Sequence, residues 1–486
     1  MINTLENLAN EILLNILSNL AWFEMIESFW GINKRFNSLI CLVFSMNNDG
    51  NHSGIIISEI DLSLNKYQSI LCSINSYSTL SASIKRIHID GAKSIFFDII
   101  SEWIFQENLI RFVNLKSLIL TRCCLSEILI NNVSLLVQYQ LDELILTIDK
   151  DFSEMFENQQ ESWVNDRNQV ICKHFIRQLF SSECQLTSLR LDISEDDSVF
   201  EIRECLSSSD DIYSNRIYYQ LVTNCITLRH LHVHLIYGYF IEHIIEHVPV
   251  LEILSIRFRD VLAHERLHKM PFKQFTPIVV NWYDKVPKLK CFILKSKIND
   301  DSKFVYLKWF LNNVNHVEKL KLRLDINIKW QKDLTKRYCF IDANFIRQYC
   351  MPDTSTNLID FNFYIVFKYH LLSENIQTIE NSFKIHEFFI DRRWINVKCF
   401  FDPIMTYQHI SSISIIKPEV FDGIKDYSSI FDWKNIKYLK VDLYPSIYVF
   451  LKQFNIIFSH INCIQFDMGS FKIKHASAEQ IADYSQ

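Results

Sequence analysis

The chain has 486 residues, of which 49% are hydrophobic and 22% are charged; this composition is that of a folded globular protein and excludes a disordered one. Its formal net charge of -6 argues against a nucleic-acid-binding protein, which needs a basic face. Only seven glycines occur, and the glycine-rich phosphate-binding and nucleophile-elbow motifs are missing. The composition therefore argues against nucleotide-dependent and hydrolase-type catalysis.

The cysteines and the apolar segments indicate the cellular compartment in which the protein is found. Thirteen cysteines, an odd number without a Cys-x-x-Cys pair, are typical of a reducing environment and not of a disulfide framework or a zinc site. The first residues lack the features of a secretory signal, and no apolar run approaches the ~20 residues that span a bilayer. We expect a protein of the cytoplasm or nucleus that binds neither membrane nor nucleic acid.

The stretch from Leu8 to Leu39 is predicted to form three short helices. Five apolar residues in its first part recur at spacings that place them along one broad stripe of a helix. They are Ile12, Leu13, Ile16, Leu17 and Leu20. Three helices in roughly 40 residues cannot enclose enough apolar surface to be stable alone. We therefore expect this stretch to lie against another molecule or another part of the chain.

This stretch resembles the F-box motif over less than a tenth of the chain. Three departures stand out: Ala9 replaces the proline that pre-forms the first helical turn, Glu24-Met25 replaces Asp-Leu, and Phe36 replaces a common tryptophan. The residues that carry the resemblance are Leu8, Glu11, Ile12, Leu13, Ile16, Leu17, Leu20, Ile32, Lys34, Arg35, Phe36 and Leu39.

The resemblance implies a non-catalytic substrate receptor of an SCF-type ubiquitin ligase. Its helices would dock on the Skp-family adaptor, which a cullin holds, while the rest of the chain binds the protein to be ubiquitinated. The adaptor-binding residues would be Leu8, Ile12, Leu13, Ile16, Leu17 and Leu20, with Phe29, Ile32 and Phe36 contacting the adaptor or bracing the helices. The alternative is an interaction scaffold whose N-terminal helices cap the following repeats. The two differ in whether the apolar stripe faces outward or is buried within the chain.

Short segments of the form apolar-x-x-apolar-x-apolar recur through the rest of the chain, and we predict them to be strands. A loose pattern of this kind arises often by chance in so hydrophobic a sequence. The strict Leu-x-x-Leu-x-Leu form is expected about 0.5 times by chance but occurs three times. The segments begin at Ile57, Ile84, Leu115, Leu141, Leu186, Leu228, Leu251, Leu289, Val317, Leu358, Ile410, Ile436 and Ile461, the strict ones at Leu115, Leu141 and Leu186.

The segment at Leu115 continues into the full leucine-rich-repeat pattern, with Cys123 at the Asn/Cys position. Pro249 and Pro287 each stand between an apolar helical stretch and a strand, where proline ends a helix. We therefore predict an α/β fold: an irregular leucine-rich-repeat-like solenoid with a parallel sheet on the concave face and helices on the convex face. An ordinary α/β fold is the alternative. The predicted domains are residues 1–46, F-box-like; 47–54, a linker; 55–472, the solenoid; and 473–486, a polar tail.

The positions between the apolar residues of each predicted strand line the concave face of such a solenoid. A concave face of this kind is the usual place for a protein partner to bind. The candidate substrate-binding residues on this face are Arg190, Arg229, His230, His232, Lys290, Lys319, Lys321 and Arg323. Ile293 and Lys440 also line the face.

Two histidine patterns suggest metal chemistry. The side chains of His230, His232 and His234 project from one side of a predicted strand, about 6.6 Å apart. The run from His243 to His247 matches the His-x-x-Glu-His form of inverzincin peptidases, with both histidines on one helical face. The simpler interpretation is a polar strand lining and a chance match among 16 histidines. We expect no metal, no cofactor and no enzyme activity.

Overall fold

The computed structural model divides the chain into two compact units. Unit 1 comprises Met1–Lys329 and Gln348–Asp360, and unit 2 comprises Trp330–Arg347 and Phe361–Gln486. The predicted domain boundaries stay predictions, and residues 47–53 and 473–486 lie outside the described residues. The structure describes residues 5–46, 54–57, 63–90, 112–123, 127–148, 173–193, 224–235, 240–258, 282–300, 302–326, 341–368, 373–402, 407–412, 438–442 and 463–467.

Unit 1 begins with the three helices that the sequence predicts. A short 3-10 turn precedes them, and Ala9 provides no side-chain cap for the first helix. The third helix is capped by Asn33, whose side chain accepts the backbone N–H of Phe36, as asparagine does at many helix starts. The helices are α1 (Asn10–Ser18), α2 (Trp22–Phe29) and α3 (Lys34–Ser45).

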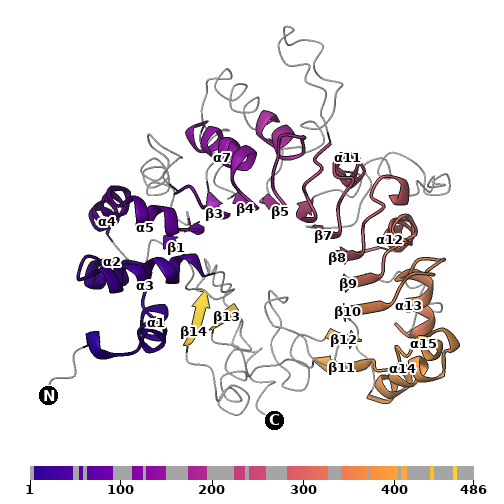
Figure 1. Cartoon of the computed structure of the whole chain (residues 1–486). Coiled ribbons are helices and arrows are strands. Elements are labelled where there is room, and N and C mark those ends of the chain that lie inside the picture. Colours follow the sequence, from indigo (N-terminus) through magenta and orange to yellow (C-terminus); the bar gives the residue numbers. More distant parts are fainter. Residues whose placement is uncertain are drawn as a thin grey trace, which may run out of the picture. The chain divides into compact units, whose positions relative to one another are not determined.

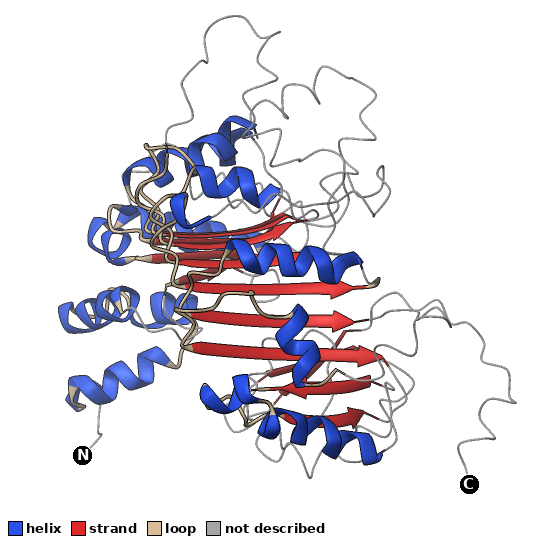
Figure 2. Ribbon diagram, turned by 90° about the vertical axis from the view of Figure 1, so that its right-hand side faces the viewer, coloured by secondary structure: helices blue, strands red, loops and turns tan. Residues whose placement is uncertain are grey.

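A parallel sheet follows in unit 1, with its strands side by side in chain order. Within this unit the strands follow a curve, and the helices that connect them lie on its outer side (Figure 1). In Figure 2 the strands run in one direction beneath these helices. The strands are β1 (Ile55–Ile57), β2 (Arg86–Asp90), β3 (Ser117–Cys123), β4 (Glu143–Ile148), β5 (Ser188–Ile193), β6 (His230–Leu235), β7 (Ile253–Phe258), β8 (Cys291–Ile298) and β9 (Lys319–Ile326).

The same main-chain hydrogen bonds join each repeat of unit 1 to the next. Just before a strand, one carbonyl oxygen accepts two consecutive backbone N–H groups from the following repeat, with N···O distances of 2.8–3.1 Å. The Lys290 carbonyl, for example, accepts from Glu318 and Lys319. These bonds are independent of the side chain and fix how neighbouring strands align. The accepting carbonyls belong to Lys85, Lys116, Asp142, Thr187, Arg229, Glu252, Lys290 and Glu318.

The apolar positions of the predicted strands form the core. All three are buried in every segment that begins between Ile84 and Leu358, as the pattern predicts. Cys123, at the expected Asn/Cys position, is buried, and its thiol donates to the Thr147 carbonyl of the next repeat. The segment at Ile57 is placed differently: β1 ends at this residue, and residues 58–62 lie outside the described part of the chain.

Helices cover the sheet of unit 1 at irregular intervals, and a further helix at 173–179 precedes β5. The irregularity follows from the unequal spacing of the strands along the chain. The remaining helices of this unit are α4 (Leu64–Ser76), α5 (Ser78–Ser83), α7 (Glu127–Tyr139), α11 (Phe240–Glu246), η5 (Trp282–Asp284) and α12 (Ser302–Asn313).

Unit 2 corrects the prediction of a wholly parallel sheet. In it β12 lies antiparallel to both β10 and β11. Only residues 403–406 separate β11 from β12, which is too short for the crossover that parallel strands need. The pattern also missed β11, whereas the segments at Ile436 and Ile461 form a parallel pair. The elements are α13 (Ala343–Tyr349), which spans the unit boundary, β10 (Asp360–Lys368), α14 (Ser373–Ile385), α15 (Glu387–Asp391), β11 (Lys398–Asp402), β12 (Tyr407–Ser411), β13 (Tyr438–Asp442) and β14 (Cys463–Asp467).

Phe310 of α12 is at the centre of an aromatic cluster between the helices and the sheet of unit 1. Its ring centroid lies 4.9 Å from that of Trp282, 5.5 Å from Phe292 and 6.1 Å from Phe258. The Phe310 side chain is fully buried. Edge and stacked contacts of this kind add to the free energy of burying the rings.

We predict that Phe310→Ala destabilises the chain by about 3–5 kcal/mol, because the cavity it leaves cannot close fully. Val305→Ala on the same helix is the matched control, since Val305 is exposed. Urea unfolding followed by tryptophan fluorescence measures both. Equal midpoints for the two variants would contradict the packing described above.

Candidate interaction surfaces

The apolar stripe of α1 divides between the interior and the surface. Leu13 and Leu17 are each 1% exposed, and α1 packs against α3. Ile12 and Ile16 are 50% and 36% exposed. Leu13 and Leu17 are therefore core residues in this structure, while their assignment to adaptor binding stays a prediction. The physical reason is that the stripe is wider than one contact face, so a neighbouring helix covers half of it.

The other predicted adaptor-binding residues also fall into a buried group and an exposed group. Phe36 is buried and stacks on the half-buried Phe29 with a centroid distance of 5.6 Å, so Phe36 braces the helices. Leu8 and Leu20 are half-buried. Ile32, in the turn between α2 and α3, is exposed. What remains at the surface is Leu8, Ile12, Ile16, Leu20, Phe29 and Ile32, fully or in part.

Arg35 ties the start of α3 to the residues before α1. Its guanidinium donates to the Asn10 side chain and to the backbone carbonyls of Glu6 and Leu8. Asn33 donates to the Glu6 carboxylate at 3.0 Å. These bonds hold the turn that carries Ile32 beside the segment that carries Leu8. The sequence indicated Arg35 only as a motif residue, and its hydrogen bonds were not predicted.

Helices α2 and α3 lie against the first repeat of the sheet. The Trp22 ring of α2 stacks on Tyr67 of α4 with a centroid distance of 6.3 Å, and its indole N–H donates to the Ile56 carbonyl of β1. Glu27 pairs with Lys66 at 3.0 Å, and α3 contacts α5. The support that three short helices need comes in part from the chain itself. Trp22 was not predicted, since its partners lie beyond the motif.

The inward face of the sheet carries the predicted lining residues in cross-strand rows. One row runs through Arg190, His232, Ser255, Ile293 and Lys321 on strands β5 to β9. Arg190, Arg229, His230, Lys290, Lys319 and Lys321 are exposed, and His232, Ile293 and Arg323 are half-buried. The side chain of Lys440, in β13, lies outside what the structure describes.

Asp192 draws two of these residues into a polar cluster. Arg190 donates to its carboxylate at 2.7 Å, His232 Nε2 lies 3.4 Å from it, and His232 Nδ1 lies 2.8 Å from the Ser255 hydroxyl. Burial raises the pKa of Asp192, but hydrogen bonds and positive charge from His232 and Arg190 outweigh it and lower the pKa to about 2. Arg190 and His232 thus have a structural partner.

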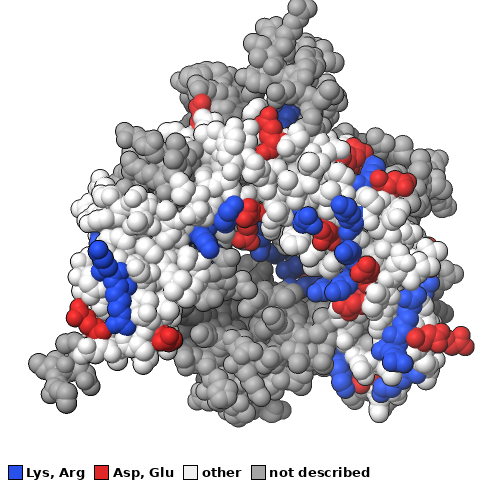
Figure 3. Space-filling view, in the orientation of Figure 1, with Lys and Arg blue, Asp and Glu red and all other residues white. Residues whose placement is uncertain are grey.

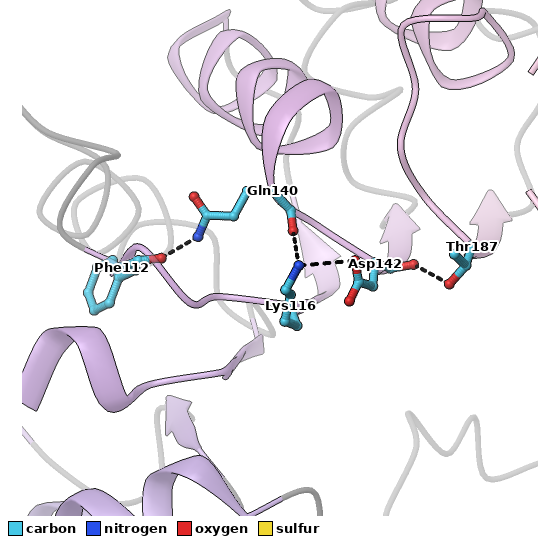
Figure 4. A network of polar contacts seen from close by, with 5 residues as sticks. All are labelled: Phe112, Lys116, Gln140, Asp142 and Thr187. Carbon is cyan, nitrogen blue, oxygen red and sulfur yellow. Dashed lines mark hydrogen bonds and ion pairs between the residues drawn. The ribbon is translucent and has the colours of Figure 1, made fainter. Parts of the chain in front are cut away.

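A second polar network lies at the strand starts (Figure 4). Lys116 donates to the Gln140 carbonyl and pairs with Asp142, both at 3.3 Å. Thr187 donates to the Asp142 carbonyl at 3.1 Å, and Gln140 donates to that of Phe112. Further along, the predicted binding residue Arg229 pairs with Glu252 at 2.6 Å. These exposed pairs contribute little stability, so they mainly align neighbouring repeats.

The two histidine patterns do not converge on a metal site. No group of three His, Cys, Asp or Glu side chains in the described residues is placed to hold a metal ion. Helix α11 ends at Glu246, so His247 lies one residue beyond the helix that carries His243. The Glu246 carboxylate pairs with Lys285 at 2.6 Å. The proline at 249 explains the early end of this helix.

Comparisons with known proteins give this chain no family. No protein-family model matches the sequence, and no curated protein matches it either. In the described residues, no helix has the length and apolar character to cross a membrane.

We predict that Asp192→Asn lowers the free energy of unfolding at neutral pH by about 2 kcal/mol. Because the folded pKa of about 2 lies below the usual 3.8, this stabilisation is present above about pH 4 and is lost as the pH falls towards 2. Unfolding midpoints of both proteins between pH 7 and 3 measure it. Asp142→Asn, at a half-exposed ion pair, is the control. An equal effect of both substitutions would contradict the cluster's role.

Proposed function

We propose that this chain is a non-catalytic interaction protein that acts as the substrate receptor of an SCF-type ubiquitin ligase. Helices α1 to α3 bind the Skp-family adaptor, which a cullin holds, and the inward sheet face of unit 1 binds the substrate. The proposal rests on the F-box resemblance of residues 8–39, and one observation supports it best. Ile12 and Ile16 remain exposed although α1 packs on α3 with its other apolar residues.

An exposed pair of isoleucines one helical turn apart is the usual form of a helix that docks in an apolar groove. Ile32 is exposed as well, and Arg35 and Asn33 hold its turn beside the start of α1. Leu13 and Leu17 take the complementary role of fixing α1 on the chain. The adaptor-binding set is therefore the outward half of the predicted stripe together with Ile32.

The receptor acts by positioning. It contributes no bond-making residue, but it raises the effective concentration of substrate lysines beside the conjugating enzyme. Positioning requires a stiff connection between the two binding surfaces. The Trp22 contacts with Tyr67 and Ile56 provide one, because they fasten α2 to the first repeat of the sheet.

The second candidate is a scaffold in which the N-terminal helices serve only as the cap of the repeats. The packing of α2 on α4 and of α3 on α5 favours it, since solenoids need their open apolar ends covered. A cap alone makes no use of the exposed Ile12 and Ile16. The two candidate functions therefore predict different outcomes when a charged residue is introduced on α1.

We predict that Ile16→Asp abolishes co-purification with the Skp-family adaptor, because it places an unpaired charge in a desolvated interface. Asn15→Asp adds the same charge at the neighbouring exposed position of α1 and is expected to retain the adaptor. A pull-down with purified adaptor measures both, with a chain lacking residues 1–48 as the blank. Retention of the adaptor by the Ile16→Asp chain would contradict the proposal.

We predict that Trp22→Ala destabilises the chain by about 3–5 kcal/mol through the lost stack on Tyr67. Leu42→Ala, at an exposed position of α3, is the control. Thermal unfolding measures both. A Trp22→Ala chain as stable as the control would show that α2 is not fastened to the sheet.

A further inference from the structure

Six basic side chains gather on the inward positions of strands β7 to β9. We call them the basic patch: Arg257, Lys295, Lys297, Lys319, Lys321 and Arg323. Among the described inward positions of these three strands, Asp325 is the one carboxylate. Figure 3 shows the blue side chains over these strands, to the right of the centre. This local excess of positive charge stands in a chain whose formal net charge is -6.

The register brings like charges side by side. Lys295 lies opposite Arg257 on one neighbouring strand and opposite Arg323 on the other. Like charges directly across a sheet repel one another, so this row adds to the positive potential of the face. Lys297, Lys319 and Lys321 are exposed. These three exposed lysines are therefore accessible to a negatively charged partner.

The charge is confined to one part of the sheet. The equivalent positions of β3 are Ser117, Ile119 and Thr121, and those of β4 are Glu143, Ile145 and Thr147. On β5, Arg190 is paired with Asp192. The positive face therefore begins after β5, and it is not a general property of the solenoid.

We propose that the basic patch binds an extended, carboxylate-rich segment of a protein partner. The inference rests on the proposed use of the inward face for substrate binding and names the substrate chemistry. Lysines on one strand alternate with a spacing of about 6.6 Å, and neighbouring strands lie about 4.8 Å apart. Side chains of an extended acidic peptide repeat at similar intervals, so several carboxylates can each meet a separate ammonium group.

Two other anionic partners fit less well. A single phosphate is best held by a bidentate arginine cluster, whereas four of the six basic residues here are lysines. Single-stranded nucleic acid needs aromatic side chains on which bases stack. The described inward positions of β6 to β9 carry histidine but no phenylalanine, tyrosine or tryptophan. The lysine-dominated face therefore favours distributed carboxylates.

The test is fluorescence anisotropy with the full chain and a labelled twelve-residue peptide in which Glu alternates with Ser. Binding that weakens with salt is expected, since exposed charges are screened. Lys297→Glu/Lys321→Glu should raise the Kd at least about fivefold, and Lys297→Gln/Lys321→Gln should have a smaller effect in the same direction. Lys384→Glu/Lys398→Glu, at exposed lysines of α14 and β11, should leave the Kd unchanged. Thermal unfolding checks that every variant is folded.

Two comparison probes decide the class of partner. A peptide with Gln in place of Glu should not bind, and a single-stranded DNA of equal charge should bind more weakly than the acidic peptide. No binding of the acidic peptide, equal binding of the Gln peptide, or tighter binding of the DNA would each overturn the proposal. Ile16→Asp should bind the acidic peptide as the unaltered chain does. Loss of adaptor binding and loss of peptide binding are thus separate results.

Discussion

The structure of unit 1 depends on one hydrogen-bond pattern, in which a carbonyl before each strand accepts two N–H groups from the next repeat. Because only main-chain atoms take part, residues as different as Lys85, Asp142 and Thr187 occupy the position. The pattern fixes the register, and the register sets which side chains stand side by side. Both the apolar core columns and the inward polar rows follow from it. The set of side chains that the sheet face presents is therefore a consequence of main-chain geometry.

The sequence could predict which face of a strand or helix a residue occupies, but not which elements pack or pair with one another. Alternation of apolar and polar residues places Leu320 towards the core and Lys321 on the inward face, whatever strand lies next to β9. The length of a connection determines whether the two strands it joins run parallel or antiparallel. The short link between β11 and β12 makes this pair antiparallel, not parallel as predicted. Similarly, the helical period marked the stripe of α1, but only the position of α3 decides that Leu17 is core and Ile16 is surface.

The interaction partners of charged side chains were also beyond what the sequence could predict. Arg190 and Lys321 stand in one cross-strand row and looked alike in the sequence as candidate binding residues. Asp192, two residues along the same strand, engages Arg190, and His232 of the next strand completes the cluster. The roles of such residues depend on cross-strand neighbours that are far apart in the chain. The sequence pattern can thus assign a residue to one face of a strand. Its interaction partners can be identified only when the register of the paired strands is known.

The two proposed surfaces are joined where α2 packs against the first repeat of the sheet. Trp22 contributes an apolar ring to Tyr67 and a hydrogen bond to the carbonyl of Ile56, so it restrains both the distance and the orientation of α2. Arg35 and the buried Leu13 and Leu17 then carry that restraint to α1. A flexible link would let the outward isoleucines and the inward lysines move independently, and effective concentration falls with such freedom. In the proposed receptor, rigidity at this junction, more than affinity at either surface, would determine how precisely a bound partner is presented.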